Sequence, residues 1–471
     1  MTPIGTEASP LRVAIVGSGP SGFYAAGQLL SAKGRPDLVV EVDIFDRLPT
    51  PWGLVRGGVA PDHPNIKAVS RVFEKTAARP GFRFFGNVEL GRDVSHEDLT
   101  SRYHAIIYAV GAETDKRMGI PGEDLAGSVA ATEFVAWYNG HPDYREREFD
   151  LSCKRAVVVG NGNVAMDVAR MLAITPAELE RTDVADHALE VLRDAAIEEI
   201  VVLGRRGPAQ AAFTNPELRE LGEMVDADVL VDPGDVAIDE HSASSIDHDG
   251  DLTARRNVEI LTGYSERRPT GKRKRIILRF LVSPVAIVGD GRVEAVELAH
   301  NQIAWDEQGV PRAVATERRE TLPAGLVFRS IGYRGVALPG VPFDERRGTI
   351  PNDAGRVIDP QAQAPIRGVY NVGWIKRGPS GVIGTNKKDA HETVESLLAD
   401  LDRGALLEPA DPAPEAVDAL LAECRPDHVT HAGWQAIDRA ERAAGEPHDR
   451  PRVKLCSFDE LLAVAYDRTA G

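Results

Sequence analysis

The sequence predicts an α/β protein built around two βαβ units. Arg12–Val16 is a short strand-like run of mostly apolar residues that leads directly into a glycine-rich turn, Gly17–Gly22, and then into a helical pattern. Arg155–Val159 leads in the same way into Gly160–Ala165. The two units start roughly 140 residues apart, which predicts two separate domains in one chain.

The two βαβ units can be followed residue by residue. In the first, Phe23–Ala32 predicts a helix and Leu38–Phe45 a second strand that ends at Asp46. In the second, a helix continues to Met171 and Ile197–Leu203 forms the next strand, which leads into Gly204-Arg205-Arg206-Gly207.

The rest of the chain shows weaker patterns. Residues 245–320 predict antiparallel strands, Arg275–Val282 among them, because apolar and polar residues alternate between glycines and prolines. Asp239–Asp251 predicts a polar loop. The other predicted elements are strands at Leu326–Ile331 and Gly368–Trp374, helices at Glu392–Leu401 and Glu415–Ala444, and a loop at Leu406–Pro414.

Composition limits the classes of function. The 471 residues carry a formal net charge of −17, which argues against general binding to nucleic acid or an anionic membrane. No apolar run reaches the roughly 18 residues that span a bilayer, and Met1–Pro10 has no signal-peptide pattern. The three cysteines are far apart and the histidines show no metal-ligand spacing, so we expect no metal site and a cytoplasmic location.

The first glycine turn has the chemistry of a dinucleotide site. Gly17 permits the tight turn, Gly19 lets a pyrophosphate approach the backbone at the helix start, and Gly22 lets helix and strand pack closely. Asp46 is placed to accept a hydrogen bond from a ribose hydroxyl. The alternative is a tight turn without a ligand.

The second glycine turn differs in charge. Arg205 and Arg206 stand where the first unit has an acid, and two guanidinium groups can bind a ribose 2′-phosphate. The second site is therefore predicted to take NADP(H), with a solvated turn as the alternative.

A flavin in the first site and a nicotinamide in the second is a glutathione-reductase-like layout of two Rossmann-like domains. Because the chain has no C-x-x-C pair, there is no redox disulfide and electrons must pass to an external acceptor.

Several long motifs resemble the adrenodoxin reductase-type ferredoxin–NADP(+) reductases. The similarity extends over essentially the whole chain, and the last motif resembles the actinobacterial, mycobacterial form in particular. The motifs are Pro51–Arg56 with Gly58–Pro64, Gly160–Ala165 with Asp167–Arg170, Gly204–Gly207, Gly373–Pro379 with Gly381–Asn386, and Pro447–Lys454.

The resemblance implies FAD in the first domain and NADP(H) in the second. It divides the chain into an FAD-binding domain at 1–112 and 331–471 and an inserted NADP-binding domain at 113–330. By position, the implied FAD contacts are Ser21, Asp46, Leu54, Leu90 at the end of the third strand, Trp374, Gly381, Val382 and Ile383. The implied NADP contacts are Asn161, Gly162, Asn163, Val164, Arg205, Arg206 and Glu217, with Arg117 as a further candidate.

Two residues are candidates for proton handling near the flavin and nicotinamide. His63 lies in a loop between Pro61 and Pro64, and it could hold a proton, or it could serve only as a structural histidine bonded to the backbone. Glu220 is the second candidate. Asp167 could orient His63 or simply lie on the surface of its helix.

The family's electron acceptor is a ferredoxin-type iron–sulfur protein, which is usually acidic. A chain of charge −17 needs a local basic surface to dock it. The candidate patch is Arg267, Arg268, Lys272, Arg273, Lys274, Arg275 and Arg279, with Lys376, Arg377, Lys387 and Lys388 elsewhere. The alternative for the 267–279 run is a solvated hairpin tip.

Alternative functions of the protein are another NADPH-dependent flavoenzyme, such as a monooxygenase or diaphorase, and a non-catalytic flavoprotein scaffold.

Overall fold

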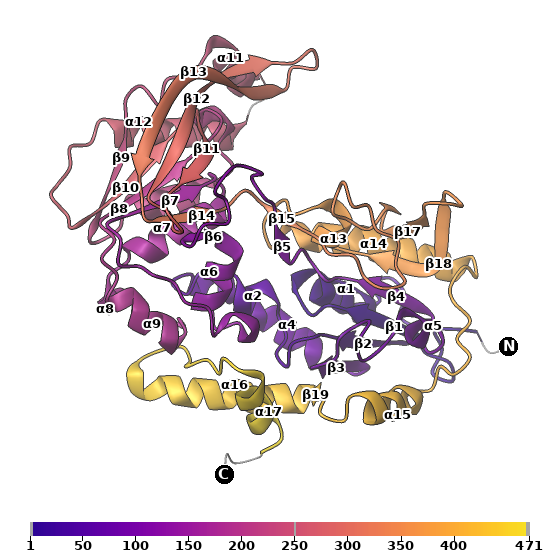
Figure 1. Cartoon of the computed structure of the whole chain (residues 1–471). Coiled ribbons are helices and arrows are strands. Elements are labelled where there is room, and N and C mark those ends of the chain that lie inside the picture. Colours follow the sequence, from indigo (N-terminus) through magenta and orange to yellow (C-terminus); the bar gives the residue numbers. More distant parts are fainter. Residues whose placement is uncertain (1–2, 249–250, 468–471) are drawn as a thin grey trace. The chain divides into compact units, whose positions relative to one another are not determined.

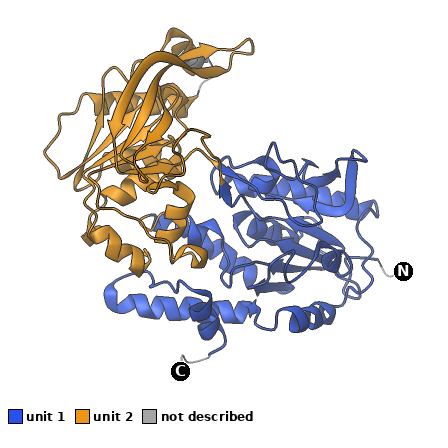
Figure 2. Cartoon of the chain, viewed as in Figure 1, with its two compact units in different colours: residues 1–59, 63–114, 333–471 blue, residues 60–62, 115–332 orange. Residues whose placement is uncertain are grey.

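The chain folds into two compact units. The computed structural model describes residues 3–248 and 251–467. Unit 1 comprises residues 1–59, 63–114 and 333–471, and unit 2 comprises residues 60–62 and 115–332 (Figure 2). The units therefore divide at 114/115 and 332/333, against 112/113 and 330/331 for the predicted domains. The assignment of one cofactor to each unit stays a prediction.

Unit 1 contains a mixed sheet of eight strands in the order β16-β17-β18-β4-β1-β2-β3-β19 (Figure 1). Strands β18, β4, β1, β2 and β3 run parallel, while β16, β17 and β19 join antiparallel at the two edges. The bounds are β1 Leu11–Val16, β2 Val40–Phe45, β3 Phe82–Gly86, β4 Ala105–Tyr108, β16 Asn352–Asp353, β17 Arg356–Asp359, β18 Ala364–Asn371 and β19 Val429–Thr430.

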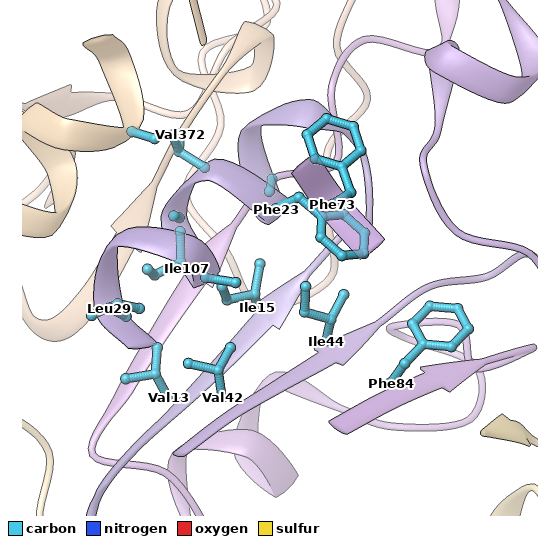
Figure 3. Close-up of a cluster of buried hydrophobic side chains, with 14 of the residues drawn as sticks. Val13, Ile15, Phe23, Leu29, Val42, Ile44, Phe73, Phe84, Ile107 and Val372 are labelled. Atoms are coloured by element: carbon cyan, nitrogen blue, oxygen red, sulfur yellow. The ribbon is translucent and has the colours of Figure 1, made fainter. Parts of the chain in front are cut away.

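Alternate residues of β1 and β2 point into two apolar clusters, one on each face of this sheet. Val13 and Ile15 pack with Phe23 of α1 and Phe73 of α4 (Figure 3). Ala14, Val16 and Phe45 join the cluster on the other face, with Leu421 of α15. The helices of unit 1 are α1 Pro20–Ser31, α2 Leu54–Gly57, α3 Pro64–Lys67, α4 Ser70–Ala77, α5 His96–Thr100, α13 Trp374–Arg377, α14 Thr385–Asp402, α15 Pro414–Cys424, α16 His431–Gly445 and α17 Phe458–Ala465.

Unit 2 contains a parallel sheet of six strands in the order β6-β14-β7-β8-β10-β9. A three-stranded antiparallel sheet, β11-β12-β13, contributes Val282, Val296 and Leu298 to an apolar cluster that includes Val157 and Val201 of the first sheet. The bounds are β6 Ser128–Ala130, β7 Arg155–Val159, β8 Glu199–Leu203, β9 Ala227–Val231, β10 Lys274–Arg279, β11 Val282–Val288, β12 Ala295–Trp305, β13 Pro311–Pro323 and β14 Leu326–Arg329.

Two predictions for the middle of the chain are wrong. Arg275–Val282 was predicted as antiparallel, but β10 pairs in parallel with both β8 and β9. Its alternation arises because one side of β10 is fully buried and the other only partly covered. The described part of Asp239–Asp251 is mostly helix α11, and residues 249–250 lie outside the described residues. The helices of unit 2 are α6 Ala131–Tyr138, α7 Asn163–Ala173, α8 Pro176–Leu179, α9 Asp186–Arg193, α10 Asn215–Leu221, α11 Glu240–His248 and α12 Leu252–Ser265.

The predicted long helical stretch at the C-terminal end, Glu415–Ala444, is interrupted. Strand β19 separates α15 from α16 and pairs with β3 at the edge of the unit 1 sheet. Across residues 3–248 and 251–467, no helix is both long enough and apolar enough to cross a membrane.

Candidate nucleotide sites

The first glycine turn lies between β1 and α1 of unit 1. Gly17 has φ +106°, and a Cβ there would lie 2.5 Å from the Ala109 carbonyl oxygen, so only glycine fits without strain. A Cβ on Gly22 would lie 2.2 Å from the Gly17 carbonyl oxygen. Gly19 caps the start of α1 and would place a Cβ in open space. The turn therefore leaves room for a ligand at a helix N-terminus.

Asp46 follows β2 and accepts hydrogen bonds from the neighbouring turn. Its carboxylate accepts from the Ser18 backbone N–H at 2.8 Å, from the Leu48 N–H at 2.9 Å and from the Ser18 hydroxyl. Burial raises the pKa of Asp46, against the lowering effect of these hydrogen bonds. Ser18, which holds Asp46 beside the turn, was not among the site residues predicted from the sequence. The predicted bond from Asp46 to a ribose stays a prediction.

The loop that contains Leu54 touches the first glycine turn. The Trp52 N–H donates to the Ser18 carbonyl at 2.9 Å, and a Cβ on Gly53 would lie 2.9 Å from the Gly19 Cα. Leu54 begins α2, with 39% of its surface exposed next to this turn. Leu90 does not end the third strand as predicted, because β3 ends at Gly86 and Leu90 instead bridges to Val94.

The second glycine-rich stretch of unit 1 surrounds Trp374. The indole Nε1 of Trp374 is buried and has no hydrogen-bond partner among the described residues. Ser21 lies beside this stretch, since a Cβ on Gly373 would lie 2.2 Å from the Ser21 hydroxyl oxygen. Gly381, Val382 and Ile383 precede α14, and Val382 is 54% exposed. Ser21 and Gly373 therefore bring the two glycine-rich stretches of unit 1 together.

The glycine turn of unit 2 repeats this geometry between β7 and α7. Gly160 has φ +128°, and a Cβ there would lie 2.0 Å from the Ser330 carbonyl oxygen. Gly162 caps α7, again with open space where a Cβ would be. The Asn161 carbonyl accepts from the Ala212 N–H at 3.1 Å, and the Asn163 side chain accepts from the Thr214 N–H at 2.8 Å. Val164 lies in the first turn of α7.

Arg205 and Arg206 follow β8, and among the described residues neither forms an ion pair with a carboxylate. Arg205 is exposed and Arg206 is half-buried. Burial and the neighbouring charge of Arg205 lower the pKa of Arg206. Two adjacent guanidinium groups without an acid are a suitable site for a phosphate dianion.

A buried arginine gathers four carboxylates of unit 2. Arg170 on α7 lies 2.6 Å from Asp62, 2.6 Å from Asp167, 3.2 Å from Glu217 and 3.6 Å from Glu220 (N to O). Burial alone would lower the pKa of Arg170, but the facing carboxylates raise it above its ordinary value. Asp167 therefore pairs with Arg170 rather than merely lying on the helix surface. Glu217 and Glu220 are held in place by the same group, whose role the sequence did not reveal.

The structure also places the predicted residues His63, Glu220 and Arg117. His63 precedes α3 in unit 1, whereas Glu220 lies on α10 in unit 2, and their shared proton role stays a prediction. Arg117 is 56% exposed at its side chain and pairs with Asp124 at 2.5 Å and Glu123 at 3.7 Å.

The predicted basic patch is largely neutralised. Lys274 is buried in β10, and Arg273, Arg275 and Arg279 pair with Asp226, Glu199 and Glu320. The hairpin-tip interpretation is wrong for Lys274–Arg279, because these residues form an interior strand of the sheet. Lys376 is also buried, with its ammonium 3.0 Å from Asp389 and 2.6 Å from Glu392.

The residues present fit a flavin dinucleotide in unit 1 and a phosphorylated nicotinamide dinucleotide in unit 2. Gly19 and Gly162 each leave open space at a helix N-terminus, where a pyrophosphate is stabilised by free N–H groups and the helix dipole. The unpartnered Nε1 of Trp374 offers a donor in unit 1. Arg205 and Arg206 offer a phosphate site in unit 2.

Known proteins resemble this chain over nearly all of its length. Residues 11–202 match the family described as pyridine nucleotide-disulphide oxidoreductase. The NADPH-ferredoxin reductase FprA of Mycobacterium leprae is 53% identical over 97% of this chain and 98% of its own length. The mitochondrial NADPH:adrenodoxin oxidoreductase of Salvelinus fontinalis is 41% identical over 98% of this chain and 92% of its own. The structure of Mycobacterium tuberculosis FprA in complex with NADPH has a TM-score of 0.91 and 52% identity, covering 97% of this chain and 100% of that one.

Proposed function

Because the chain belongs to the adrenodoxin reductase-type ferredoxin–NADP(+) reductases, we propose that it uses FAD to transfer electrons from NADPH to a ferredoxin. When bound, FAD accepts a hydride from NADPH and releases its electrons one at a time. The observation that carries this proposal is the contrast between the two units. Two similar glycine turns are followed by an acid in unit 1, Asp46, and in unit 2 by Arg205 and Arg206, which pair with no carboxylate in the part of the chain that the structure describes.

In this proposal the residues of unit 1 bind FAD without reacting with it. The open turn at Gly19 receives the pyrophosphate, and Asp46 accepts from a ribose hydroxyl. The remaining proposed contacts are Gly17, Gly22, Ser21, Leu54, Leu90, Trp374, Gly381, Val382 and Ile383. These groups orient the cofactor and exclude water from it.

The residues of unit 2 bind NADPH. We assign the pyrophosphate to the turn at Gly162, with Asn161, Asn163 and Val164, and the 2′-phosphate to Arg205 and Arg206. Glu217, which is held beside Arg170, is a further proposed contact of NADPH. Arg117 is left out because Asp124 and Glu123 already pair with it. His63 and Glu220 are proposed to hold protons near the nicotinamide.

The acceptor is proposed to be an acidic iron–sulfur protein that docks on a local basic surface. We restrict the proposed docking patch to Arg267, Arg268 and Lys272, because the other four basic residues of this run are buried or paired with acids. Of these three, Arg267 lies over the Tyr264 ring and Lys272 donates to the Met224 carbonyl, whereas Arg268 forms neither kind of contact within the described residues. A cytoplasmic location also stays a proposal.

Anaerobic reduction of the FAD-loaded protein tests the function. NADPH should bleach the flavin absorbance within one turnover, and adding an oxidised iron–sulfur ferredoxin should restore it. NADH at the same concentration serves as the matched control and should bleach it far more slowly. No bleaching by either coenzyme would indicate a flavoprotein scaffold. A monooxygenase would give a different result. Its bleached flavin would be reoxidised by oxygen, with hydroxylation of a substrate, and not by ferredoxin.

A further inference from the structure

The main chain of residues 204–206 accepts hydrogen bonds from the turn at Leu281 and Val282 and from the side chain of Asn301. The Val282 N–H donates to the Gly204 carbonyl at 3.1 Å, and the Leu281 N–H donates to the Arg206 carbonyl at 3.2 Å. Between them, Asn301 Nδ2 donates to the Arg205 carbonyl at 2.8 Å. Three consecutive carbonyls of this segment therefore accept a hydrogen bond.

Asn301 also fixes the turn that supplies the other two bonds. Its Nδ2 donates a second hydrogen bond to the Ser283 hydroxyl at 2.7 Å, and its own backbone N–H donates to the Leu281 carbonyl at 2.7 Å. Asn301 is only 9% exposed. Both hydrogens of its amide group are therefore used, one on the arginine segment and one on the turn behind it.

The turn itself has an unfavourable backbone conformation. Leu281 has φ +54°, in the left-handed region that a leucine seldom adopts and that persists only where its surroundings hold it. The strand that presents Asn301 is irregular at the same place, with a shift in the β12–β13 register between Ala299 and Asn301. The antiparallel sheet of unit 2 thus departs from regular geometry where it supports the arginines.

We propose that Asn301 is a positioning residue for coenzyme specificity, which holds the Arg205 main chain so that Arg205 and Arg206 can bind a 2′-phosphate together. The inference rests on the proposed use of NADPH. Asn301 has no predicted contact with the coenzyme and acts through the arginine segment. A fixed main chain lowers the entropy that is lost when two long side chains bind one phosphate.

The test compares two ligands that differ only in the 2′-phosphate. Calorimetry on the FAD-loaded protein would measure the binding of adenosine 2′,5′-bisphosphate and of adenosine 5′-monophosphate. Asn301→Leu, which keeps the size of the side chain and removes both donated bonds, should weaken binding of the bisphosphate about tenfold, or roughly 1.4 kcal/mol. Binding of the monophosphate should change less than about twofold. In steady-state kinetics the NADPH KM should rise with kcat unchanged.

The matched control is another buried asparagine of unit 2. Asn139 is 1% exposed and its Nδ2 donates to the Val135 carbonyl at 3.1 Å, at the end of α6. Asn139→Leu should leave the preference for the 2′-phosphate unchanged even if it lowers the melting temperature. This variant separates an effect on the arginine segment from a general loss of stability.

Each outcome bears on the inference. Equal weakening of both ligands would overturn it, because Asn301 would then support the nucleotide site as a whole. No weakening of either ligand would overturn it as well. If the unmutated protein bound both ligands equally, the NADPH assignment itself would fail, and the inference would fail with it.

Discussion

The two glycine turns of this chain have similar backbone conformations. They differ in the charge that follows the next strand and in how the surrounding residues hold it. Gly17 and Gly160 both have positive φ and both lie against a carbonyl oxygen. In unit 1 the following acid, Asp46, is buried and accepts three hydrogen bonds from its own neighbourhood. In unit 2 the following arginines pair with no acid of residues 3–248 and 251–467, and the hydrogen bonds go to their main chain instead.

This difference separates the two tasks of a dinucleotide site. In the proposed assignment, the glycines of both units determine where a pyrophosphate can approach. The charge after the second strand determines which ribose is accepted. An acid can be held by bonds to its carboxylate, because its remaining lone pairs still accept from a ribose. Cations must keep their own donors free for a phosphate, so the support comes through the backbone.

The largest effect is expected when the unpaired charges of unit 2 are removed. Replacing Arg205 and Arg206 together by alanine should lower kcat/KM for NADPH several hundredfold. This corresponds to a loss of about 3–4 kcal/mol of transition-state stabilisation, because two charge-assisted hydrogen-bonding groups are lost. The value for NADH should change little. Steady-state kinetics with both coenzymes measures the ratio.

A second pair of adjacent arginines provides the control for this double variant. Arg318 and Arg319 are exposed on β13 of the same unit, and their replacement by alanine makes the same change in net charge. NADPH kinetics should be unaffected. If the Arg318/Arg319 variant lost as much NADPH activity as the first, the effect would be a general electrostatic one and the 2′-phosphate assignment would be wrong.

The units also differ in how their sheets bury charge, which predicts a pH effect on stability. Unit 1 buries Arg12 against Asp43 at 2.7 Å. Unit 2 buries Lys274, whose ammonium donates to the Leu172 carbonyl at 2.6 Å with no carboxylate at ion-pair distance in the described residues. Burial lowers the pKa of Lys274 from 10.5 to about 8.

Between pH 8 and 10.5 the native chain has lost the Lys274 proton while the unfolded chain still holds it. Unfolding therefore takes up a proton, and the free energy of unfolding rises with pH across this window, by at most about 3 kcal/mol. Lys274→Met should lack that rise, as measured by urea unfolding at several pH values. Lys154→Met, which changes an exposed lysine paired with Glu198, should keep it. Parallel pH profiles for the wild type and Lys274→Met would contradict the assignment.

The local parts of both sites could be predicted from the sequence. The strands before the glycine turns were placed within one residue, at 12–16 against Leu11–Val16 and at 155–159 as found. These elements depend on apolar runs and glycines that are neighbours in the chain. The family resemblance extended this local reading to the whole chain, and the comparisons confirm it.

The contacts that support the sites could not be predicted, because they join residues far apart in sequence. Asn301 reaches Arg205 across 96 positions, and Arg170 reaches Asp62 across 108. The basic run 267–279 was misjudged for the same reason. Whether Lys274 is solvated or buried depends on the strands beside it, and its own neighbours in the chain do not show this.

Intermediate effects are expected at the two glycines that leave open space. Gly19 has φ −71° and Gly162 has φ −97°, both accessible to alanine, and no atom lies within 4 Å of an added Cβ. The fold should therefore tolerate Gly19→Ala and Gly162→Ala, and the methyl group should obstruct only a bound pyrophosphate. We expect FAD affinity to fall about tenfold in the first variant and the NADPH KM to rise about tenfold in the second.

Fluorescence titration with FAD and steady-state kinetics measure these two effects separately. Gly263→Ala is the control, since Gly263 also leaves open space but lies on α12 away from the proposed contacts. It should change neither constant. If Gly162→Ala altered FAD affinity and left NADPH unchanged, the assignment of cofactors to the two units would be reversed.

The smallest effect is expected at Arg117, which sharpens the distinction between paired and unpaired arginines within unit 2. Its guanidinium lies 2.5 Å from Asp124 and 3.7 Å from Glu123, with the side chain 56% exposed. Exposed ion pairs of this kind contribute little to stability because water screens the two charges, but a phosphate would have to displace both acids. Arg117→Ala should therefore change the NADPH KM less than about twofold and leave the melting temperature nearly unchanged. A tenfold rise in KM would show that a paired arginine can still bind the coenzyme. The absence of an acid beside Arg205 and Arg206 would then no longer identify the phosphate site.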